Sequence, residues 1–189
     1  MTSSAAEPRR YTYGDLMEWD DGKRYELYDG VPEAMSSPTE AHQLVLGELY
    51  RQIANFLVGK PCKAYIAPFD VRLFDAAGDR PEDSLYVLQP DLMVVCDHDK
   101  VDRRGVRGAP DLVIEILSPS TQANDRLRKF RLYERASVRE YWIVDPERRT
   151  VQVYTPEEGR YCAAEAYAGG TVPVGVLDGC AIELDMVFA

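Results

Sequence analysis

The sequence contains few of the residues that build zinc sites or disulfide frameworks. Its four cysteines are scattered along the chain, at Cys62, Cys96, Cys162 and Cys180. No C-x-x-C pair occurs, and the two histidines, His42 and His98, lack zinc-ligand spacing, so zinc modules are excluded. We expect three or four of the cysteines to be reduced, partly buried thiols of a cytoplasmic protein.

Long apolar runs are also missing. No stretch approaches the ~20 apolar residues of a membrane span, and the first residues, MTSSAAEPRRYTYGD, lack the apolar segment of a secretory signal. The hydrophobic fraction of 46% over 189 residues is enough for one buried core. We therefore expect a flexible tail over residues 1–10, a single domain over 11–189, and no membrane segment.

Phosphate-binding loops and a basic excess are absent as well. No G-x-G-x-x-G, G-x-x-x-x-G-K-[ST] or G-x-S-x-G motif occurs at a strand end, which disfavours nucleotide cradles and a hydrolase nucleophile elbow. The 22 Lys and Arg stand against 32 Asp and Glu, for a net charge of −10. This balance argues against tight, non-specific DNA binding, but it leaves a local basic patch or a carboxylate metal site open.

The elements that are present predict a mixed sheet flanked by helices. RYELYDGVPEAMS (24–36) predicts a hairpin that turns at Asp29-Gly30. Residues 37–59 predict a helix that starts at Ser37 or Thr39 and ends at Gly59. Strands are expected within 62–74, 88–97 and 111–118, a second helix within 121–137, and further strands from 139 onward. Strand–helix–strand from Leu112 to Val144 predicts a crossover between parallel strands, in an α/β or α+β fold.

Two acids stand on predicted strands. Glu115 lies in the middle of DLVIEILS, where an ionised carboxylate is costly unless a positive group compensates it. Residues two apart share a strand face, so one face holds Asp111, Val113, Glu115 and Leu117. If this strand pairs with QPDLMVV, Asp91 and Glu115 converge, and a divalent cation such as Mg²⁺, Mn²⁺ or Ca²⁺ would relieve their repulsion. The alternative is that Asp91 caps a turn and Glu115 pairs with an arginine.

Other candidates surround these two acids. Asp125, Lys129 and Tyr133 are spaced i, i+4, i+8, so Lys129 can reach a phosphate or orient a water, or simply pair with Asp125. Glu26 is a third strand acid, with a solvated glutamate as the alternative. His42 opens the first predicted helix, where a surface histidine is the alternative.

Several motifs, taken in order, resemble those of one family. They are YELYDG (25–30), SPTEAHQ (37–43), QPDLMVV (89–95), GAPDLVIEILSPST (108–121), the D-x-x-x-K-x-x-x-Y of 125–133, VREYWIVDP (138–146), VQVYTPEEGRY (151–161) and IELDMVF (182–188). Over residues 12–188 the chain resembles the Uma2 family of restriction-type endonucleases, within the PD-(D/E)XK nuclease superfamily. No single motif is specific, but their order is.

The resemblance implies a restriction-endonuclease-like core and a metal-dependent phosphodiesterase site. Asp91 matches the acid of the "PD" motif and Glu115 the acid of the "ExK" motif. Leu117 stands where the superfamily has its lysine, and the family places that lysine on the following helix, here Lys129. Glu26 matches the family's first-motif acid, and His42 its helix-start histidine.

A mechanism follows from this resemblance. Asp91 and Glu115, helped by Glu26 and the backbone carbonyl of Ile116, would hold Mg²⁺ or Mn²⁺. Lys129 would position the attacking water or offset developing charge, and Tyr133 would hold Lys129 or a phosphate.

The expected function is a metal-dependent endonuclease acting on DNA, as a homodimer. The alternatives are a binding or assembly module of the same fold with little hydrolysis, and a phosphodiesterase acting on RNA or a small substrate. The surface charge separates them: a basic strip would favour nucleic acid, and a negative rim would favour the others. The arginines that could form such a strip are Arg103, Arg104, Arg107, Arg126 and Arg128.

Overall fold

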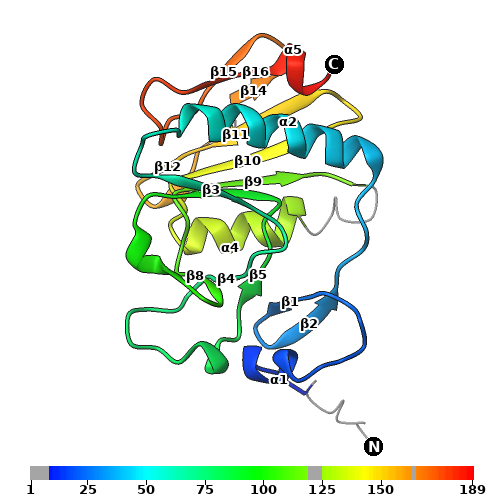
Figure 1. Ribbon diagram of the computed structural model, residues 1–189, viewed down its shortest axis with the longest axis vertical. Helices are drawn as coiled ribbons and strands as arrows, with labels where there is room; N and C mark the ends of the chain where they lie inside the picture. Colours follow the sequence, from blue (N-terminus) through cyan, green and yellow to red (C-terminus); the bar gives the residue numbers. More distant parts are fainter. Residues whose placement is uncertain (1–8, 119–124, 163–164) are drawn as a thin grey trace, which may run out of the picture.

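The molecule is built on two six-stranded mixed sheets with helices packed against them (Figure 1). The structure is a computed structural model that describes residues 9–118, 125–162 and 165–189. The predicted mixed α+β architecture is confirmed. The predicted tail over 1–10 falls mostly outside the described residues, and the single domain over 11–189 stays a prediction.

The larger layer is a central sheet, in which most strands pair with strands that are distant in the sequence. Its strands, in spatial order, are β14 (Glu165–Tyr167), β11 (Thr150–Tyr154), β10 (Glu140–Asp145), β9 (Leu112–Ile116), β6 (Leu92–Val95) and β3 (Lys63–Ile66). β9 and β10 are parallel, with Glu115 opposite Ile143, as the predicted crossover requires. β6 runs antiparallel to β9 with Leu92 opposite Ile114, so Asp91 comes next to the end of β9.

The second sheet is made of short strands and lies below the first in Figure 1. Its strands, in spatial order, are β2 (Val31–Ala34), β1 (Tyr25–Tyr28), β5 (Val87–Leu88), β4 (Val71–Arg72), β8 (Gly105–Arg107) and β7 (Val101–Asp102). The β1–β2 pair is the predicted hairpin. Asp29 (φ 54°) and Gly30 (φ 76°) form its two-residue turn, since this turn type needs positive φ at both positions.

Helices cover both faces of the central sheet. The helical segments are α1 (Tyr13–Met17), α2 (Glu40–Phe56), a π-helical turn η3 (Asp125–Lys129), α4 (Phe130–Arg135) and α5 (Leu184–Val187). Thr39 caps α2 by accepting a hydrogen bond from the backbone N–H of His42, which agrees with the predicted start. Of the second predicted helix, within 121–137, residues 121–124 lie outside the described part, 125–129 form the π-helical turn and Phe130–Arg135 form α4.

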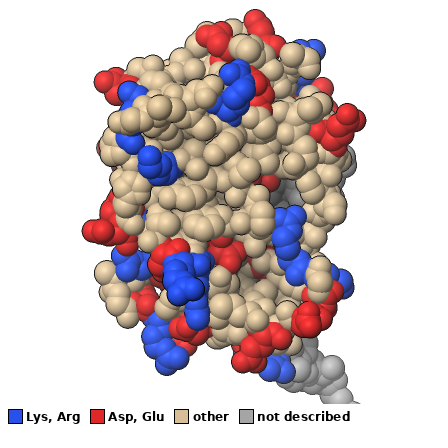
Figure 2. Space-filling view, in the orientation of Figure 1, with Lys and Arg blue, Asp and Glu red and all other residues tan. Residues whose placement is uncertain are grey.

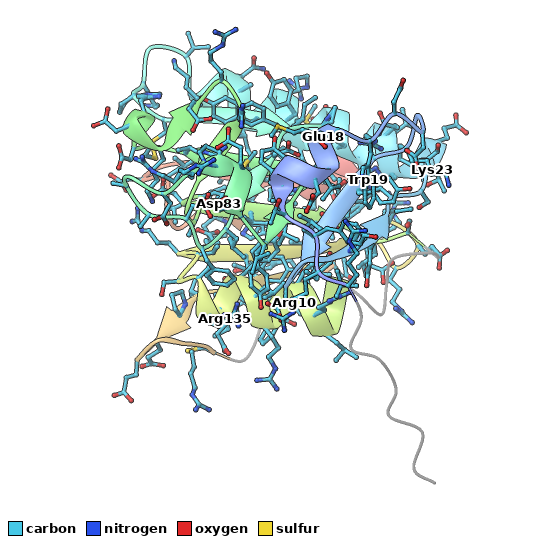
Figure 3. The ribbon with its side chains drawn as sticks, turned by 90° about the horizontal axis from the view of Figure 1, so that it is seen from below. Arg10, Glu18, Trp19, Lys23, Asp83 and Arg135 are labelled. Atoms are coloured by element: carbon cyan, nitrogen blue, oxygen red, sulfur yellow. A yellow bond between two sulfur atoms is a disulfide. The ribbon has the colours of Figure 1, made fainter. Side chains whose placement is uncertain are left out.

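Smaller elements complete the fold. They are 3₁₀ turns at Pro81–Asp83 and His98–Lys100, the ribbon of β12 (Pro156–Glu157) and β13 (Arg160–Tyr161), and the ribbon of β15 (Thr171–Pro173) and β16 (Ala181–Glu183). Near the N-terminus, Trp19 lies edge-on against Tyr11 and Tyr25, and so joins the end of α1 to the hairpin (Figure 3).

The core is split between the two faces of β9, as the alternation of its residues predicts. Leu112, Ile114 and Ile116 belong to the cluster that includes the buried face of α2. Val113 and Leu117 belong to the opposite cluster, with Leu132 and Tyr133 of α4. Glu115 therefore points to the α4 side, between two buried apolar neighbours on its own face.

The expectation that three or four cysteines are unpaired is wrong for two of them. Cys62 and Cys96 form a disulfide, and only Cys162 and Cys180 are free. The pairing follows from the register, because Lys63 of β3 lies opposite Val95 of β6, which places the next residues outward, Cys62 and Cys96, side by side.

No helix within the described ranges is both long and apolar enough to cross a membrane. The cytoplasmic location expected from the sequence stays a prediction.

The disulfide can be tested by thiol counting. We predict that the protein, unfolded in guanidinium without reductant, exposes the two thiols of Cys162 and Cys180, and that reduction exposes all four. Because the bridge closes a loop of 34 residues, reduction is expected to lower the free energy of unfolding by about 4 kcal/mol. Four reactive thiols before reduction would show that Cys62 and Cys96 are unpaired.

Candidate active site

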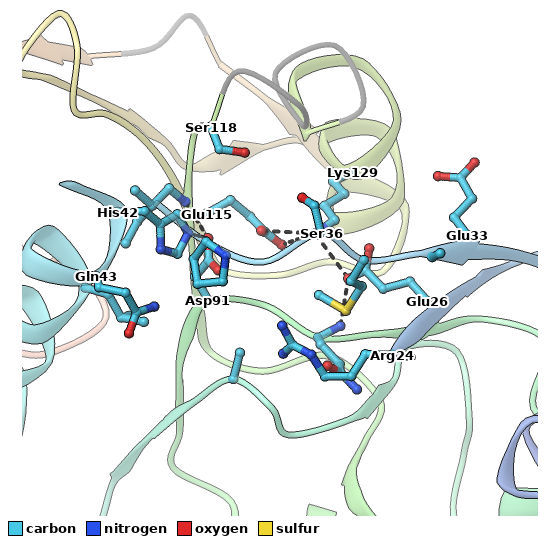
Figure 4. A pocket seen from close by; sticks show the side chains of 17 residues that line it. Arg24, Glu26, Glu33, Ser36, His42, Gln43, Asp91, Glu115, Ser118 and Lys129 are labelled. Carbon is cyan, nitrogen blue, oxygen red and sulfur yellow. Dashed lines mark hydrogen bonds and ion pairs between the residues drawn. The ribbon is translucent and has the colours of Figure 1, made fainter. Parts of the chain in front are cut away.

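Six of the predicted site residues, Ile116 and five with polar side chains, line one cavity at the carboxyl end of β9 (Figure 4). Glu26, His42, Asp91, Glu115 and Lys129 lie in its wall, and its volume is about 360 Å³. Hairpin β1–β2, the start of α2, the residue before β6, the end of β9 and the π-helical turn η3 supply these side chains. This arrangement agrees with the sequence prediction that Asp91 and Glu115 approach one another.

Glu115 is compensated by the lysine of the following helix. Lys129 donates from Nζ to both carboxylate oxygens of Glu115, at 3.0 Å each, and the hydroxyl of Tyr133 donates to Oε1 at 2.7 Å. Glu115 is 2% exposed and Lys129 4%. Lys129 therefore supplies the positive group that an acid in this strand requires. The side chain of Asp125, the other partner considered for Lys129, lies outside what the structure describes.

Lys129 also binds a second buried acid. Its Nζ lies 3.1 Å from Oε1 of Glu26, an oxygen that also accepts the backbone N–H of Gln89 at 2.8 Å. The hydroxyl of Tyr28 donates to the other oxygen of Glu26 at 2.6 Å. Glu26 is therefore not a solvated strand acid. Lys129 bridges Glu26 and Glu115, and so links the two sheets.

Two tyrosines support the bridge as donors. Burial, more than the neighbouring Glu115, raises the pKa of Tyr133 well above its ordinary value, and burial likewise raises the pKa of Tyr28. Both hydroxyls therefore stay protonated at neutral pH and donate hydrogen bonds to the two acids. Tyr133 is placed one helical turn after Lys129, so that both reach Glu115, as the i, i+4 spacing predicts.

Asp91 is held from the other face of the sheet. Its Oδ2 accepts the backbone N–H of Ile116 at 2.7 Å and lies 3.1 Å from Nε2 of His42 on α2. Its Oδ1 has no hydrogen-bond partner among the described residues. Asp91 therefore binds the backbone of β9 instead of capping its own turn. His42 is buried, and its Nδ1 has no hydrogen-bond partner among the described residues either.

The donor set of this wall fits a hard divalent cation. Mg²⁺ is commonly bound through one or two carboxylates, with waters in the other positions. Asp91 and Glu115 supply the carboxylates, and Oδ1 of Asp91 has no partner in the described part. Within residues 9–118, 125–162 and 165–189, no group of three or more His, Cys, Asp and Glu residues is placed so that it could hold a metal ion. The carboxylate oxygens of Asp91 and Glu115 are donors of the kind that Mg²⁺ and Mn²⁺ prefer.

The cavity also contains residues that the sequence analysis did not select. Arg24 and Gln89 line it, and the carbonyl oxygen of the Gln89 side chain is buried without a hydrogen-bond partner among the described residues. The signal that could have found them is spacing. Arg24 is two residues before Glu26, and Gln89 is two residues before Asp91, so each lies near its acid on an extended segment.

Three of the arginines that could form a basic strip are bound within the molecule. Arg104 pairs with Glu82, Arg107 donates to the carbonyl oxygen of Asp99, and Arg128 pairs with Glu33 and lies over the Tyr28 ring. The side chain of Arg126 lies outside the described residues, and Arg103 is exposed. On the face shown in Figure 2, basic and acidic side chains are interspersed.

Three comparisons place the chain among known proteins. The Uma2 family model, whose description is "Putative restriction endonuclease", matches residues 13–185. The uncharacterized protein slr1290 of Synechocystis sp. is 28% identical over 145 residues, which cover 74% of this chain and 71% of that protein. A crystal structure from Anabaena variabilis, described as "a putative nuclease belonging to DUF820", matches with a TM-score of 0.73. Its identity is 18%, over 94% of this chain and 97% of that chain, so this likeness shows the fold alone.

Replacing Lys129 tests the bridge. We predict that Lys129→Met lowers the free energy of unfolding by about 3–5 kcal/mol, because it leaves two buried carboxylates without their cation. The exposed Lys63 of β3 provides a matched control, and Lys63→Met is expected to change stability by less than about 0.5 kcal/mol. Denaturant unfolding of both variants measures the difference. Equal, small losses in the two would contradict a buried bridge at Lys129.

Proposed function

Because this chain belongs to the Uma2 family, we propose that it is a metal-dependent endonuclease that hydrolyses phosphodiester bonds of DNA. One observation carries the proposal: Asp91, Glu115 and Lys129 line the same cavity at the end of a buried strand. Two acids with a lysine beside them are the groups that metal-assisted phosphodiester hydrolysis requires.

The metal would be held by Asp91, Glu115 and the backbone carbonyl of Ile116, with Glu26 in support. Bound there, Mg²⁺ or Mn²⁺ would lower the pKa of a water and offset charge on the phosphate. The family is the reason to expect a metal, and the oxygen donors of the cavity are the reason to expect Mg²⁺ or Mn²⁺ rather than zinc.

The protein's own residues fix the acids in place. The backbone N–H of Ile116 and the imidazole of His42 both bind Oδ2 of Asp91, so the carboxylate cannot rotate freely and Oδ1 stays available to the cavity. Lys129 and Tyr133 hold Glu115 in the same way. In this proposal Lys129 also offsets negative charge that develops during hydrolysis, because a buried ammonium group acts more strongly there than in water.

A second class of function is favoured by one observation. Arg104, Arg107 and Arg128 are each bound within the molecule, and the net charge is −10. Bound arginines and an acidic net charge suit a binding or assembly module, or a phosphodiesterase for RNA or a small substrate. These alternatives make different predictions for the same experiment.

Metal binding and DNA nicking, measured on the same samples, test the proposal. We predict that calorimetry detects Mg²⁺ or Mn²⁺ binding to the wild type, and that Glu115→Ala and Asp91→Asn each weaken binding. Both variants should reduce nicking of supercoiled plasmid by about 100-fold or more, because a lost ligand removes the metal's contribution to the transition state. The exposed Glu147, in the turn after β10, provides the control: Glu147→Ala should match the wild type in both assays.

The other outcomes assign the other functions. Metal binding without nicking of DNA, but with cleavage of RNA or a small phosphodiester, would support a phosphodiesterase for RNA or a small substrate. No metal binding in a folded wild type would leave Glu115 as a structural acid and would favour the binding module.

We further propose a homodimer, in which two cavities would serve the two strands of a duplex. β3 is an edge strand of the central sheet, and two of its four residues, Lys63 and Ile66, are exposed. Light scattering coupled to gel filtration is predicted to give twice the 21.3 kDa chain mass. A monomer mass at micromolar concentration would contradict the dimer.

A further inference from the structure

One cation in the cavity wall is not used by the bridge described above. Arg24 immediately precedes β1, is half-buried, and lines the cavity together with Glu26. Residues two apart in an extended segment point to the same side, so Arg24 and Glu26 both face the cavity. Figure 4 shows the two side chains there, together with Asp91.

Arg24 differs from the neighbouring cations in having no partner. Lys129 is bound to Glu26 and Glu115, and Arg128 is bound to Glu33 and stacked on Tyr28. The guanidinium group of Arg24 has no ion pair and no hydrogen bond within residues 9–118, 125–162 and 165–189. A positive charge that faces a cavity without a counter-ion is available to a ligand.

The charge of the cavity makes such a cation necessary for an anionic ligand. Four acids line it, Glu26, Glu33, Asp91 and Glu115, and Lys129 is the shared partner of two of them. A phosphodiester that approaches this wall is repelled by the acids unless cations offset them. Guanidinium suits this task, because its planar fork donates two parallel hydrogen bonds to phosphate oxygens.

The position of Arg24 is fixed by the hairpin. The backbone N–H of Met35 donates to the carbonyl oxygen of Arg24 at 2.9 Å, and the next pair inward is Tyr25 with Ala34. The backbone is therefore held by the same pairing that delivers Glu26 to Lys129. The side chain of Arg24 therefore extends from a backbone position that is fixed relative to the acids, unlike that of a mobile surface arginine.

We propose that Arg24 binds a phosphate group of a nucleic-acid substrate in this cavity. The inference rests on the proposed function, since it assigns the substrate contact that a phosphodiesterase at Asp91 and Glu115 requires. Arg24 is a binding residue here, and no bond-making step is assigned to it.

The test measures binding separately from hydrolysis. Fluorescence anisotropy of a labelled 20-base-pair DNA duplex, in Ca²⁺ and over a series of KCl concentrations, is compared for the wild type, Arg24→Gln and Arg24→Lys. The same titrations are run with a single-stranded DNA and an RNA of the same length. The control is Arg160→Gln, which removes one exposed positive charge from the β12–β13 ribbon, outside the cavity lining.

We expect Arg24→Gln to weaken binding about 10-fold and to reduce the slope of log K against log[salt] by about 1, as the loss of one phosphate contact requires. Arg24→Lys should restore the salt slope and part of the affinity, because it keeps the charge but loses the paired hydrogen bonds. Arg160→Gln should bind like the wild type. Mn²⁺ affinity, measured by calorimetry, should be the same in the wild type and Arg24→Gln.

Two results would overturn the inference in distinguishable ways. A wild type that binds nucleic acid, with Arg24→Gln binding equally well and with an equal salt slope, would remove Arg24 from the substrate site and leave the proposed function standing. A wild type that binds none of the three nucleic acids would overturn the proposed substrate class, and this inference with it.

Discussion

The contact on which the rest of the structure depends is the ion pair of one buried lysine with two buried acids. Lys129 of the π-helical turn joins Glu115 of the central sheet to Glu26 of the hairpin. Burying these charges is costly, and their mutual attraction repays the cost only while all three are present. The second sheet is built of short strands, so this bridge and its tyrosine donors fix how the hairpin sits against β9. The fold and the candidate site therefore share one set of interactions.

The site is assembled from both faces of the central sheet at the end of one strand. β9 sends the side chain of Glu115 toward α4, and it offers the backbone N–H of Ile116 to Asp91 at its end. His42, at the first turn of α2, reaches the same oxygen of Asp91 from the opposite side. β9 thus orients two acids in different ways: it carries the side chain of Glu115, and the peptide N–H of Ile116 binds Asp91. This accounts for an acid in the middle of an otherwise apolar strand: only a rigid, buried strand can present both groups at fixed positions.

The sequence predicts well those features that depend on neighbours along the chain. The hairpin turn at Asp29-Gly30, the cap of α2 at Thr39 and the alternating faces of β9 follow from local chemistry, and the structure agrees. Features that depend on register between distant segments were not predictable. The Cys62–Cys96 pair requires β3 to lie beside β6, and the bridge of Lys129 to Glu26 requires the hairpin to dock under α4. Arg72 is buried against Asp102, which lies 30 residues further along the chain.

The charge distribution limits how a substrate can be recognised. A chain with a net charge of −10 and bound surface arginines produces no long-range attraction for a polyanion, and salt screens exposed charges beyond roughly 10 Å. In the proposed function, affinity for a phosphodiester therefore comes from contacts made inside the cavity, where desolvation strengthens them. In such a site each cation has a separate task. The charge of Lys129 is shared by Glu26 and Glu115. In the proposed function, the anion is bound instead by Arg24, whose guanidinium group has no ion pair within the described residues. In that function, a phosphate must enter the cavity to contact both Arg24 and the acids that line it.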